Sequence, residues 1–395
     1  MSLGGPHAAI GRGAIFLTGA TGLVGGLLLK RLAQECPDRP VYVLVRNCDT
    51  ASPLHHAHLL AGDITRPGLG IPKHIYGELC RSIEVIVHCA AATRFTLPLD
   101  QARQVNVLGT ANILQLARET RRLTLLLHIS STFIAGRRSG ALHEAPLRDP
   151  AGWFSSYEQS KFEAEQLLHQ QAADLPWVIT RLSTLAGDSR TGRVSKFNYF
   201  HQLLRLIPAN SFRVIPGTPD APVDLVADDW VGDALLSLLR AVPPAGSFLH
   251  LCAGPSQSLP AQELLDLAFS LRSRDLPGSC IQPSFVSVAE FEKFAADLRR
   301  KGLAVRCRMA ELLLLCLPHL EVHQHFMNDG ANALLERSGV LPLPTREFLP
   351  RVIMSCFRQG PVVFPGAQQL KTFITLRNGA GQATATSQTA GSRLT

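Results

Sequence analysis

The sequence predicts an α/β protein with a doubly wound parallel sheet and a smaller, mostly helical lobe toward its C-terminus. Three observations support this fold class. Over the first two-thirds of the chain, short apolar segments alternate with amphipathic ones, as in a parallel sheet covered by helices on both faces. The first apolar segment runs into a glycine-rich turn that opens a helix, and the sequence from residue 253 onward is mainly helical in pattern.

The elements follow one another at regular spacing. Strands are expected, in chain order, at 14–18, 41–45, 58–62, 85–89, 123–130, 177–182 and 247–252. Helices are expected at 23–35, 73–81, 100–121 and 155–172, then at 196–206 and, after a strand end, within 224–242. Because the strand segments are short and almost wholly apolar, the sheet they form should be buried on both faces.

These elements divide the chain into three predicted parts. Residues 12–252 form the domain that carries the sheet, with insertions belonging to the second lobe after residue 183. Residues 253–365 form the mostly helical lobe, which we expect to cover the carboxyl edge of the sheet, where such folds bind ligands. Residues 366–395 are rich in Gly, Ala, Ser and Thr without periodicity and are expected to be disordered.

The composition restricts the possible partners and location. A formal net charge of +8 suits phosphate-bearing ligands or an acidic protein, but the lack of a dense Lys/Arg run argues against nucleic acid. The longest apolar run, 312–317, is too short to cross a membrane, and the glycine-rich N-terminus does not have the form of a signal peptide. Nine scattered cysteines without a CxxC pair predict free thiols, no metal site and a cytoplasmic protein.

The turn "FLTGATGLVGG" predicts a dinucleotide-binding loop. Gly19 suits a tight turn, Gly22 lets a pyrophosphate approach the backbone, and Gly25 allows close packing of the helix. The pyrophosphate would bind at the N-terminus of that helix, on free N–H groups. A glycine-rich turn without a ligand is the alternative. The residues expected to contact the cofactor here are Gly19, Thr21, Gly22, Leu23, Val24 and Gly25.

The end of the second strand indicates which dinucleotide is bound. Arg46 follows that strand, and a guanidinium suits a ribose 2′-phosphate, which favours NADP over NAD. Asp49, three residues later, would instead support NAD. In "AGDIT", Asp63 and the neighbouring Ile64 are expected beside the adenine.

The stretch "SSYEQSK" predicts a helix that begins with a proton-transfer pair. Ser155 and Glu158 form an S-x-x-E capping box, and Tyr157 and Lys161 then lie one turn apart on the same face. We expect the Lys161 ammonium to lower the pKa of Tyr157, to help it exchange a proton with a substrate oxygen, and also to hold the nicotinamide ribose. Taken alone, the pair would more simply be an exposed surface contact.

A second signal precedes this helix. The strand at 123–130 leads into "HISSTFIAG", so a hydroxyl stands at its carboxyl end. Ser131 is the preferred hydrogen-bond donor to the substrate oxygen, with Thr132 and Ser130 as alternatives. Together with the glycine turn, these residues predict a dehydrogenase or reductase site on a Rossmann-type sheet.

Several stretches resemble the extended short-chain dehydrogenase/reductase superfamily, and within it the fatty acyl-CoA reductase and carrier-protein thioester reductase branch. The resemblance covers residues 12–250 well and is looser to about residue 360. The similar stretches are "TGATGLVG", "VYVLVR", "LAGDITRPGLGI", "VIVHCAAATRFTLPLDQARQVNVLGTANILQLA", "ISSTFIAG", "YEQSK" and "LPWVITRLSTLAGDSRTG".

The resemblance implies roles for further residues. It places Ala90, Ala91 and Ala92 along the cofactor and Asn106 in the helix behind the site, and it makes Ser131, Tyr157 and Lys161 the catalytic set. One departure is Arg181-Leu182, where the branch usually has Arg-Pro, so the wall beside the nicotinamide is expected to differ. A second departure is that the chain carries no adenylation or carrier domain, so we expect a stand-alone reductase to which a thioester comes in trans.

Three functions are compatible with these features. The first is an NADP-dependent reductase of a carbonyl, most simply a thioester on coenzyme A or on an acidic carrier protein, reduced to aldehyde or alcohol in lipid or secondary-metabolite biosynthesis. The second is a tailoring ketoreductase or a nucleotide-sugar epimerase or dehydratase, which Arg46 disfavours mildly. The third is a non-catalytic dinucleotide-binding protein, which the presence of both Tyr157 and Lys161 disfavours.

Overall fold

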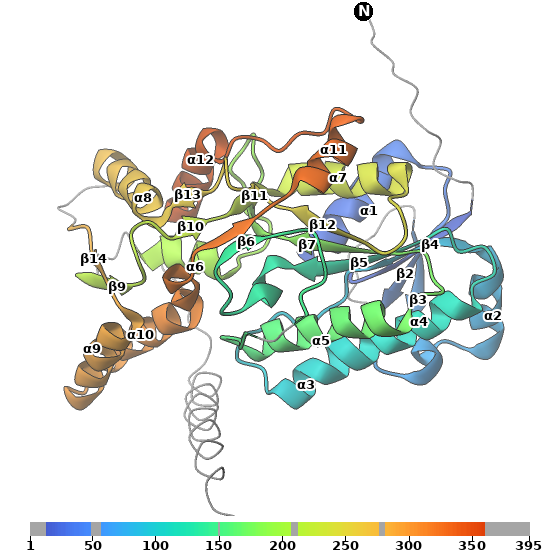
Figure 1. The fold of residues 1–395 in the computed structure, drawn as a ribbon, viewed down its shortest axis with the longest axis horizontal. Coiled ribbons are helices and arrows are strands. Elements are labelled where there is room, and N and C mark those ends of the chain that lie inside the picture. Colours follow the sequence, from blue (N-terminus) through green and yellow to red (C-terminus); the bar gives the residue numbers. More distant parts are fainter. Residues whose placement is uncertain (1–12, 49–56, 149–150, 207–211, 276–280, 360–395) are drawn as a thin grey trace, which may run out of the picture.

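The structure is a computed structural model that describes residues 13–48, 57–148, 151–206, 212–275 and 281–359 (Figure 1). Asp49 and the predicted tail at 366–395 lie outside these ranges. Within the described ranges, no helix has both the length and the apolar character needed to cross a membrane.

A seven-stranded sheet forms the centre of the molecule, in the order β12-β7-β5-β4-β1-β2-β3, with every neighbouring pair parallel. Its strands are β1 (Ala14–Thr18), β2 (Val41–Val45), β3 (Ala57–Ala61), β4 (Ile83–His88), β5 (Leu125–Ser131), β7 (Trp177–Leu182) and β12 (Ser247–Leu251). The chain moves outward from β1 to β3 and then returns to the other side of β1 as β4. Ligands of such sheets bind at this reversal, and the predicted doubly wound fold class is confirmed.

Helices cover both faces of the sheet (Figure 1). Alternate residues of β1 point to opposite faces: Ile15 and Leu17 join one hydrophobic core, and Phe16 joins the other. The first core includes α1 (Leu23–Glu35) and α7 (Asp228–Ala241), and the second is closed by α2, α4 and α5. The bounds of these last helices are Lys73–Ser82, Gly109–Glu119 and Ser156–Gln171.

The single helix predicted at 100–121 is interrupted. It consists of α3 (Leu99–Arg103), a π-helical turn at Gln104–Leu108 and α4, which ends at Glu119. The π turn carries Asn106, whose side chain is buried and hydrogen-bonded to residues outside the helix. An extra residue in one turn is a common way to redirect a side chain at a functional site, and no periodicity in the sequence marks it.

The C-terminal part adds helices at the carboxyl edge of the sheet and beyond it (Figure 1). Its helices are α6 (Tyr199–Leu206), α8 (Ala261–Asp275), α9 (Val288–Arg300), α10 (Ala304–Cys316), α11 (Asp329–Glu336) and α12 (Thr345–Arg358), with a short 3-10 turn η5 (Pro318–Glu321). Outside the main sheet, short strands pair in twos: β6 (Gly140–Leu142) with β15 (Gln324–Phe326), β8 (Thr184–Gly187) with β11 (Leu225–Ala227), β9 (Val214–Pro216) with β14 (Ser284–Val286), and β10 (Pro222–Val223) with β13 (Leu259–Pro260). Side chains of α11 and α12 join the first core of the sheet, whereas α9 and α10, together with Leu206 of α6 and Phe212, form a separate core around Phe291 and Leu313.

Candidate active site

The glycine turn between β1 and α1 is packed too closely for side chains. Gly19 has a φ of +74°, and a Cβ there would lie 2.6 Å from the backbone nitrogen of Ala90. A Cβ on Gly25 would lie 2.5 Å from the carbonyl oxygen of Gly19. The turn therefore lies directly against the residues that follow β4, and α1 packs onto the turn.

The N-terminus of α1 is open to a ligand. Gly22 is the N-cap, and no side chain caps the helix. The first N–H groups of a helix then favour an anion, and Thr21 and Gly22 are exposed on the outside of the turn. The side chain of Lys196 donates a hydrogen bond to the carbonyl oxygen of Thr21, which brings a cation to the same place.

Arg46 and Asp63 lie at neighbouring strand ends. Arg46 directly follows β2 and is exposed, and Asp63 lies two residues beyond the end of β3, the strand paired with β2. Burial alone would raise the pKa of Asp63, but the Thr65 N–H and hydroxyl and the nearby Arg46 and Arg66 outweigh it and hold the pKa below its usual value. The Ile64 side chain is buried and lies against Gly109 of α4.

The Ala90–Ala92 segment is held by Asn106. The Asn106 side chain accepts from the N–H of Ala92 at 2.8 Å and donates to its carbonyl oxygen at 3.1 Å. It also donates to the Ser160 hydroxyl at 2.8 Å, and Ser160 in turn donates to the carbonyl oxygen of Tyr157. One buried amide in the π turn thus ties the segment after β4 to the start of α5.

Ser131 and Tyr157 meet at the carboxyl end of β5. Their side chains are hydrogen-bonded, and the Ser131 hydroxyl also accepts from the N–H of Phe133 at 3.2 Å. Helix α5 begins where predicted, with Ser155 as its N-cap and the Ser155 side chain accepting from the N–H of Glu158. The reciprocal half of the predicted capping box is not formed, because the Glu158 carboxylate accepts from the N–H of Phe154 instead of Ser155. Of the three hydroxyls considered from the sequence, Ser131 is the one that the structure joins to Tyr157.

Lys161 lies one turn further along α5 and is 3% exposed. Its Nζ donates to the carbonyl oxygen of Ile129 at 2.7 Å and lies 3.2 Å from Nε2 of His128. Burial lowers the pKa of Lys161 to about 8, although the nearby Glu165 raises it.

The predicted lowering of the Tyr157 pKa by Lys161 is wrong for this structure. Burial raises the pKa of Tyr157, the hydrogen bond with Ser131 lowers it, and the Glu158 carboxylate raises it further. Lys161 is not among the groups that shift the pKa of Tyr157, and its ammonium is held by the backbone of β5 and by His128. Tyr157 is therefore a protonated phenol at neutral pH, which is the form that donates a proton.

Aromatic side chains surround the phenol. Phe95 stacks on Tyr157 at a centroid distance of 5.7 Å, and Tyr199 of α6 stacks on Phe95 at 4.3 Å. On another side, the buried Glu158 carboxylate lies 3.1 Å from Nε2 of His319 in η5. The C-terminal part therefore contributes two side chains to the surroundings of Tyr157, and the sequence had not indicated either one.

A buried polar group under the site was also missed from the sequence. His88 Nδ1 lies 2.8 Å from the hydroxyl of Thr18, which accepts from the N–H of Ala90. The rings of His88 and His128 are 5.3 Å apart, and burial, with Lys161 acting in the same direction, lowers the pKa of His88 to about 3. The only available signal was that both histidines lie within apolar strand patterns, shortly before predicted site residues.

The Arg181 side chain is held in a buried ion pair. It is 1% exposed and forms a two-pronged contact with Glu165 of α5, with Nη2 to Oε2 at 2.8 Å. Its Nη1 also lies 3.1 Å from Nε2 of His250 on β12. The next residue, Leu182, continues β7 and pairs in register with Ser131. The position where the resembling branch usually has proline is therefore part of a regular strand in this chain.

Taken together, these residues fit a dinucleotide. The glycine turn, where a Cβ would clash, and the uncapped N-terminus of α1 would bind its pyrophosphate. The guanidinium of Arg46 would bind its adenosine end. The Ala90–Ala92 segment leads from the turn toward Ser131, Tyr157 and Lys161, where a reacting group would lie.

Comparisons with known proteins agree with this geometry. The family model described as Male sterility protein matches residues 17–58 and 51–235. The isonitrile lipopeptide synthase of Streptomyces coeruleorubidus is 31% identical in a 275-residue alignment that covers 62% of this chain and 18% of that protein. Fatty acyl-CoA reductase 1 of Gallus gallus is 26% identical in a 275-residue alignment that covers 56% of this chain and 53% of that protein. The matched region thus spans about half or less of these relatives.

A solved structure shares the fold over most of the chain. The terminal R domain from the myxalamid PKS-NRPS biosynthetic pathway has a TM-score of 0.73 and 24% sequence identity, and the match covers 90% of this chain and 94% of that domain. The similarity therefore extends beyond the sheet into the C-terminal helices.

Proposed function

The chain belongs to the Male sterility protein family, in the reductase branch of the extended short-chain dehydrogenase/reductases, and we propose that it reduces an acyl thioester with NADPH. The observation that carries this proposal is the hydrogen-bonded pair of Ser131 and Tyr157 at the carboxyl end of β5, beside the buried Lys161. Two hydroxyls converge there on one place, which is what a carbonyl oxygen requires when it gains negative charge.

The proton donor in this proposal is Tyr157. Burial raises its pKa, so the phenol carries its proton and can donate it to the substrate oxygen. The N–H of Phe133 donates to the Ser131 hydroxyl, which leaves the hydroxyl hydrogen to point toward Tyr157 and the substrate. The Lys161 ammonium, held by the Ile129 carbonyl, would hold the nicotinamide ribose one turn along α5 from Tyr157.

The cofactor would be held by the glycine turn and by Arg46. When bound, NADPH supplies the hydride that reduces the carbonyl carbon. The exposed guanidinium of Arg46 at the end of β2 favours a 2′-phosphate, and it has Asp63 nearby to orient it. The hemithioacetal from a thioester then collapses to an aldehyde as the thiol leaves, and a second reduction would give the alcohol.

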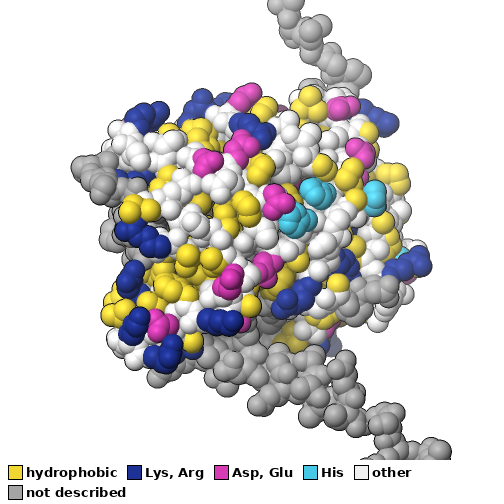
Figure 2. All heavy atoms as spheres, turned by 60° about the vertical axis from the view of Figure 1, so that its left-hand side comes forward, with side chains coloured by type: hydrophobic (Ala, Val, Ile, Leu, Met, Phe, Trp, Pro, Cys, Tyr) yellow, Lys and Arg dark blue, Asp and Glu magenta, His cyan; other side chains and the backbone are white. Residues whose placement is uncertain are grey.

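A thioester on coenzyme A or on an acidic carrier protein suits the surface of the chain. The net charge is +8, and Figure 2 shows Lys and Arg side chains between hydrophobic patches on the side that carries the C-terminal helices. Exposed cations in α9 and at its C-cap include Lys293, Arg300 and Lys301. Positive potential of this kind attracts phosphates and acidic proteins. The names of the similar proteins, an acyl-CoA reductase and a lipopeptide synthase, point to the same class of substrate.

The test is an assay of NADPH oxidation by the full chain with acyl-CoA thioesters, aldehydes and ketones. We expect thioester-dependent oxidation that falls by about 10²- to 10⁴-fold in Tyr157→Phe and by about 10²- to 10³-fold in Ser131→Ala. Ser130→Ala is the matched control, because the Ser130 hydroxyl is buried without a hydrogen-bond partner among the described residues. Oxidation with ketones but with no thioester would contradict the proposal and favour a ketoreductase.

A further inference from the structure

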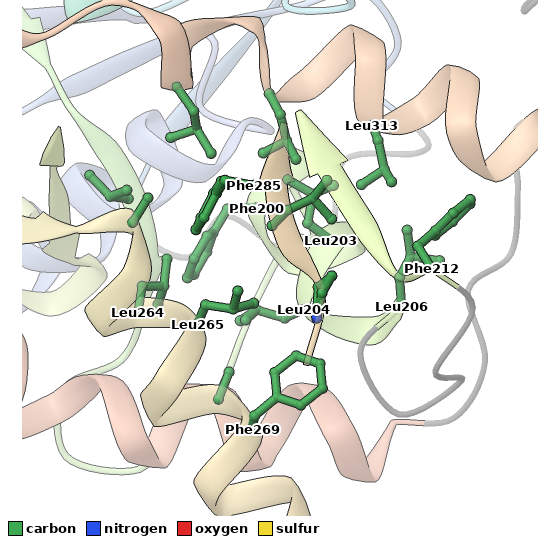
Figure 3. A pocket seen from close by; sticks show the side chains of 17 residues that line it. Phe200, Leu203, Leu204, Leu206, Phe212, Leu264, Leu265, Phe269, Phe285 and Leu313 are labelled. Carbon is green, nitrogen blue, oxygen red and sulfur yellow. The ribbon is translucent and has the colours of Figure 1, made fainter. Parts of the chain in front are cut away.

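An apolar cavity lies among the C-terminal elements, between α6, α8, α10 and η5 (Figure 3). Its volume is about 160 Å³, and all seventeen side chains that line it are apolar. In Figure 3, Phe200 and Phe285 face Leu264 and Leu265 of α8 across the space. A lining of this kind offers a ligand no hydrogen bonds from side chains, so it selects hydrocarbon.

The cavity wall continues into the surroundings of Tyr157. Phe200 lines the cavity, and its neighbour Tyr199 stacks on Phe95, which stacks on Tyr157. On the other side Leu320 lines the cavity, and its neighbour His319 contacts Glu158, the residue after Tyr157. The same two short segments thus border the reacting phenol on one side and the cavity on the other.

We propose that this cavity binds the hydrocarbon end of the acyl chain whose thioester is reduced at Tyr157. The inference rests on the proposed function and names its substrate class: an aliphatic acyl thioester rather than a peptidyl one. A peptide in this space would bury amide N–H and C=O groups against apolar side chains, without partners for them. An alkyl chain loses no such bonds and gains contact with closely packed Phe and Leu side chains.

The cavity volume limits the length of chain that gains from binding. An apolar cavity of about 150 Å³ can hold a benzene molecule, so about 160 Å³ accommodates roughly six carbon atoms. Successive methylenes that enter the cavity should each raise kcat/KM by about fourfold, which corresponds to ~0.8 kcal/mol per buried methylene. Once the cavity is filled, further methylenes should add nothing or reduce kcat/KM.

The experiment measures kcat/KM with NADPH over the series from acetyl-CoA to palmitoyl-CoA. The test variant is Leu264→Trp, which fills the cavity from α8. Leu267→Trp is the matched control, since Leu267 is also a half-buried leucine of α8 but does not line the cavity. We expect Leu264→Trp to lower kcat/KM for the preferred chain by at least about tenfold, with acetyl-CoA and the control variant almost unchanged.

A binding measurement separates this inference from the proposed function. The probe is decanoic acid, titrated by isothermal calorimetry, which should bind the wild-type chain and bind poorly to Leu264→Trp. If the probe binds in this way but no thioester is reduced, the hydrocarbon site stands and the proposed reaction fails. If thioesters of all lengths are reduced equally and Leu264→Trp matches its control, the reaction stands and the proposed site is overturned.

Discussion

Lys161 and His128 lie 3.2 Å apart, Nζ to Nε2, in the interior below the reacting phenol. Burial holds the pKa of His128 well below its usual value, and the charge of Lys161 acts in the same direction, so the imidazole is neutral. Its Nε2 then accepts from the ammonium and its proton lies on Nδ1, a buried atom with no hydrogen-bond partner among the described residues. A buried polar atom left unpaired costs about 1–3 kcal/mol, so the fold maintains this contact at the expense of stability.

The first prediction concerns pH. Burial lowers the pKa of Lys161 to about 8, so the ammonium is lost as the pH rises above that value. We expect kcat/KM with NADPH to fall above pH 8, finally by about tenfold per pH unit, and we call this decline the alkaline limb of the pH profile. Lys161→Arg stays charged at all accessible pH values and should lose this limb, whatever its absolute rate. A limb that persists in Lys161→Arg would assign the titration to another group.

Loss of folded protein would not account for this fall in activity at alkaline pH. The folded-state pKa of Lys161 is below its ordinary value of 10.5, so between about 8 and 10.5 the unfolded chain binds more protons at this group than the folded chain does. The contribution of Lys161 to stability therefore rises with pH in that window while activity falls. Thermal unfolding measured beside the kinetics distinguishes the two effects.

The second prediction concerns His128. His128→Leu removes one of the two acceptors of the Lys161 ammonium and should weaken its charged form, moving the alkaline limb to lower pH by about one unit. His128→Gln is the matched control, because its amide oxygen can replace Nε2 as acceptor and should restore the limb. Pure loss of packing would lower the rates of both variants without moving the limb. Equal pH profiles for wild type and His128→Leu would therefore exclude a positioning role.

The third prediction concerns the cofactor. Arg46→Ala should raise the KM for NADPH by at least about tenfold, the value of one charge-assisted hydrogen bond to a phosphate, and should change the KM for NADH little. Arg66→Ala is the control, since both cations act on Asp63 but only Arg46 directly follows β2. An equal effect of Arg46→Ala on both cofactors would place the 2′-phosphate elsewhere.

The fourth prediction concerns stability. Glu165→Ala leaves the buried Arg181 without its carboxylate and should lower the free energy of unfolding by about 3–5 kcal/mol. Glu163→Ala, two residues earlier on α5, breaks the more exposed pair with Arg103 and should cost less than about 1 kcal/mol. Urea denaturation of both variants gives the comparison. Similar losses in the two would mean that the Arg181 pair does not hold α5 against β7 and β12.

Much of the fold was predictable because its signals lie in adjacent residues. The apolar strand segments, the glycine turn after β1 and the Ser155–Glu158 cap each occupy one short stretch, and the structure contains all three. The helix expected at 100–121 was less well predicted, since the π turn at Asn106 depends on hydrogen bonds to Ala92 and Ser160. Those partners come from other elements, so the local pattern contained no sign of them.

By itself the sequence determined the parallel sheet, the dinucleotide turn and the spacing of Tyr157 and Lys161 on one helix face, because each follows from local periodicity or local backbone demands. Only the tertiary structure decided that Ser131 is the hydroxyl joined to Tyr157, that His128 receives the Lys161 ammonium, and that an apolar cavity lies beyond the site. It also reversed the expected direction of the Tyr157 pKa. Burial is a sum over atoms brought together from distant parts of the chain, so its effect on a titrating group or on the shape of a cavity is not contained in any single stretch.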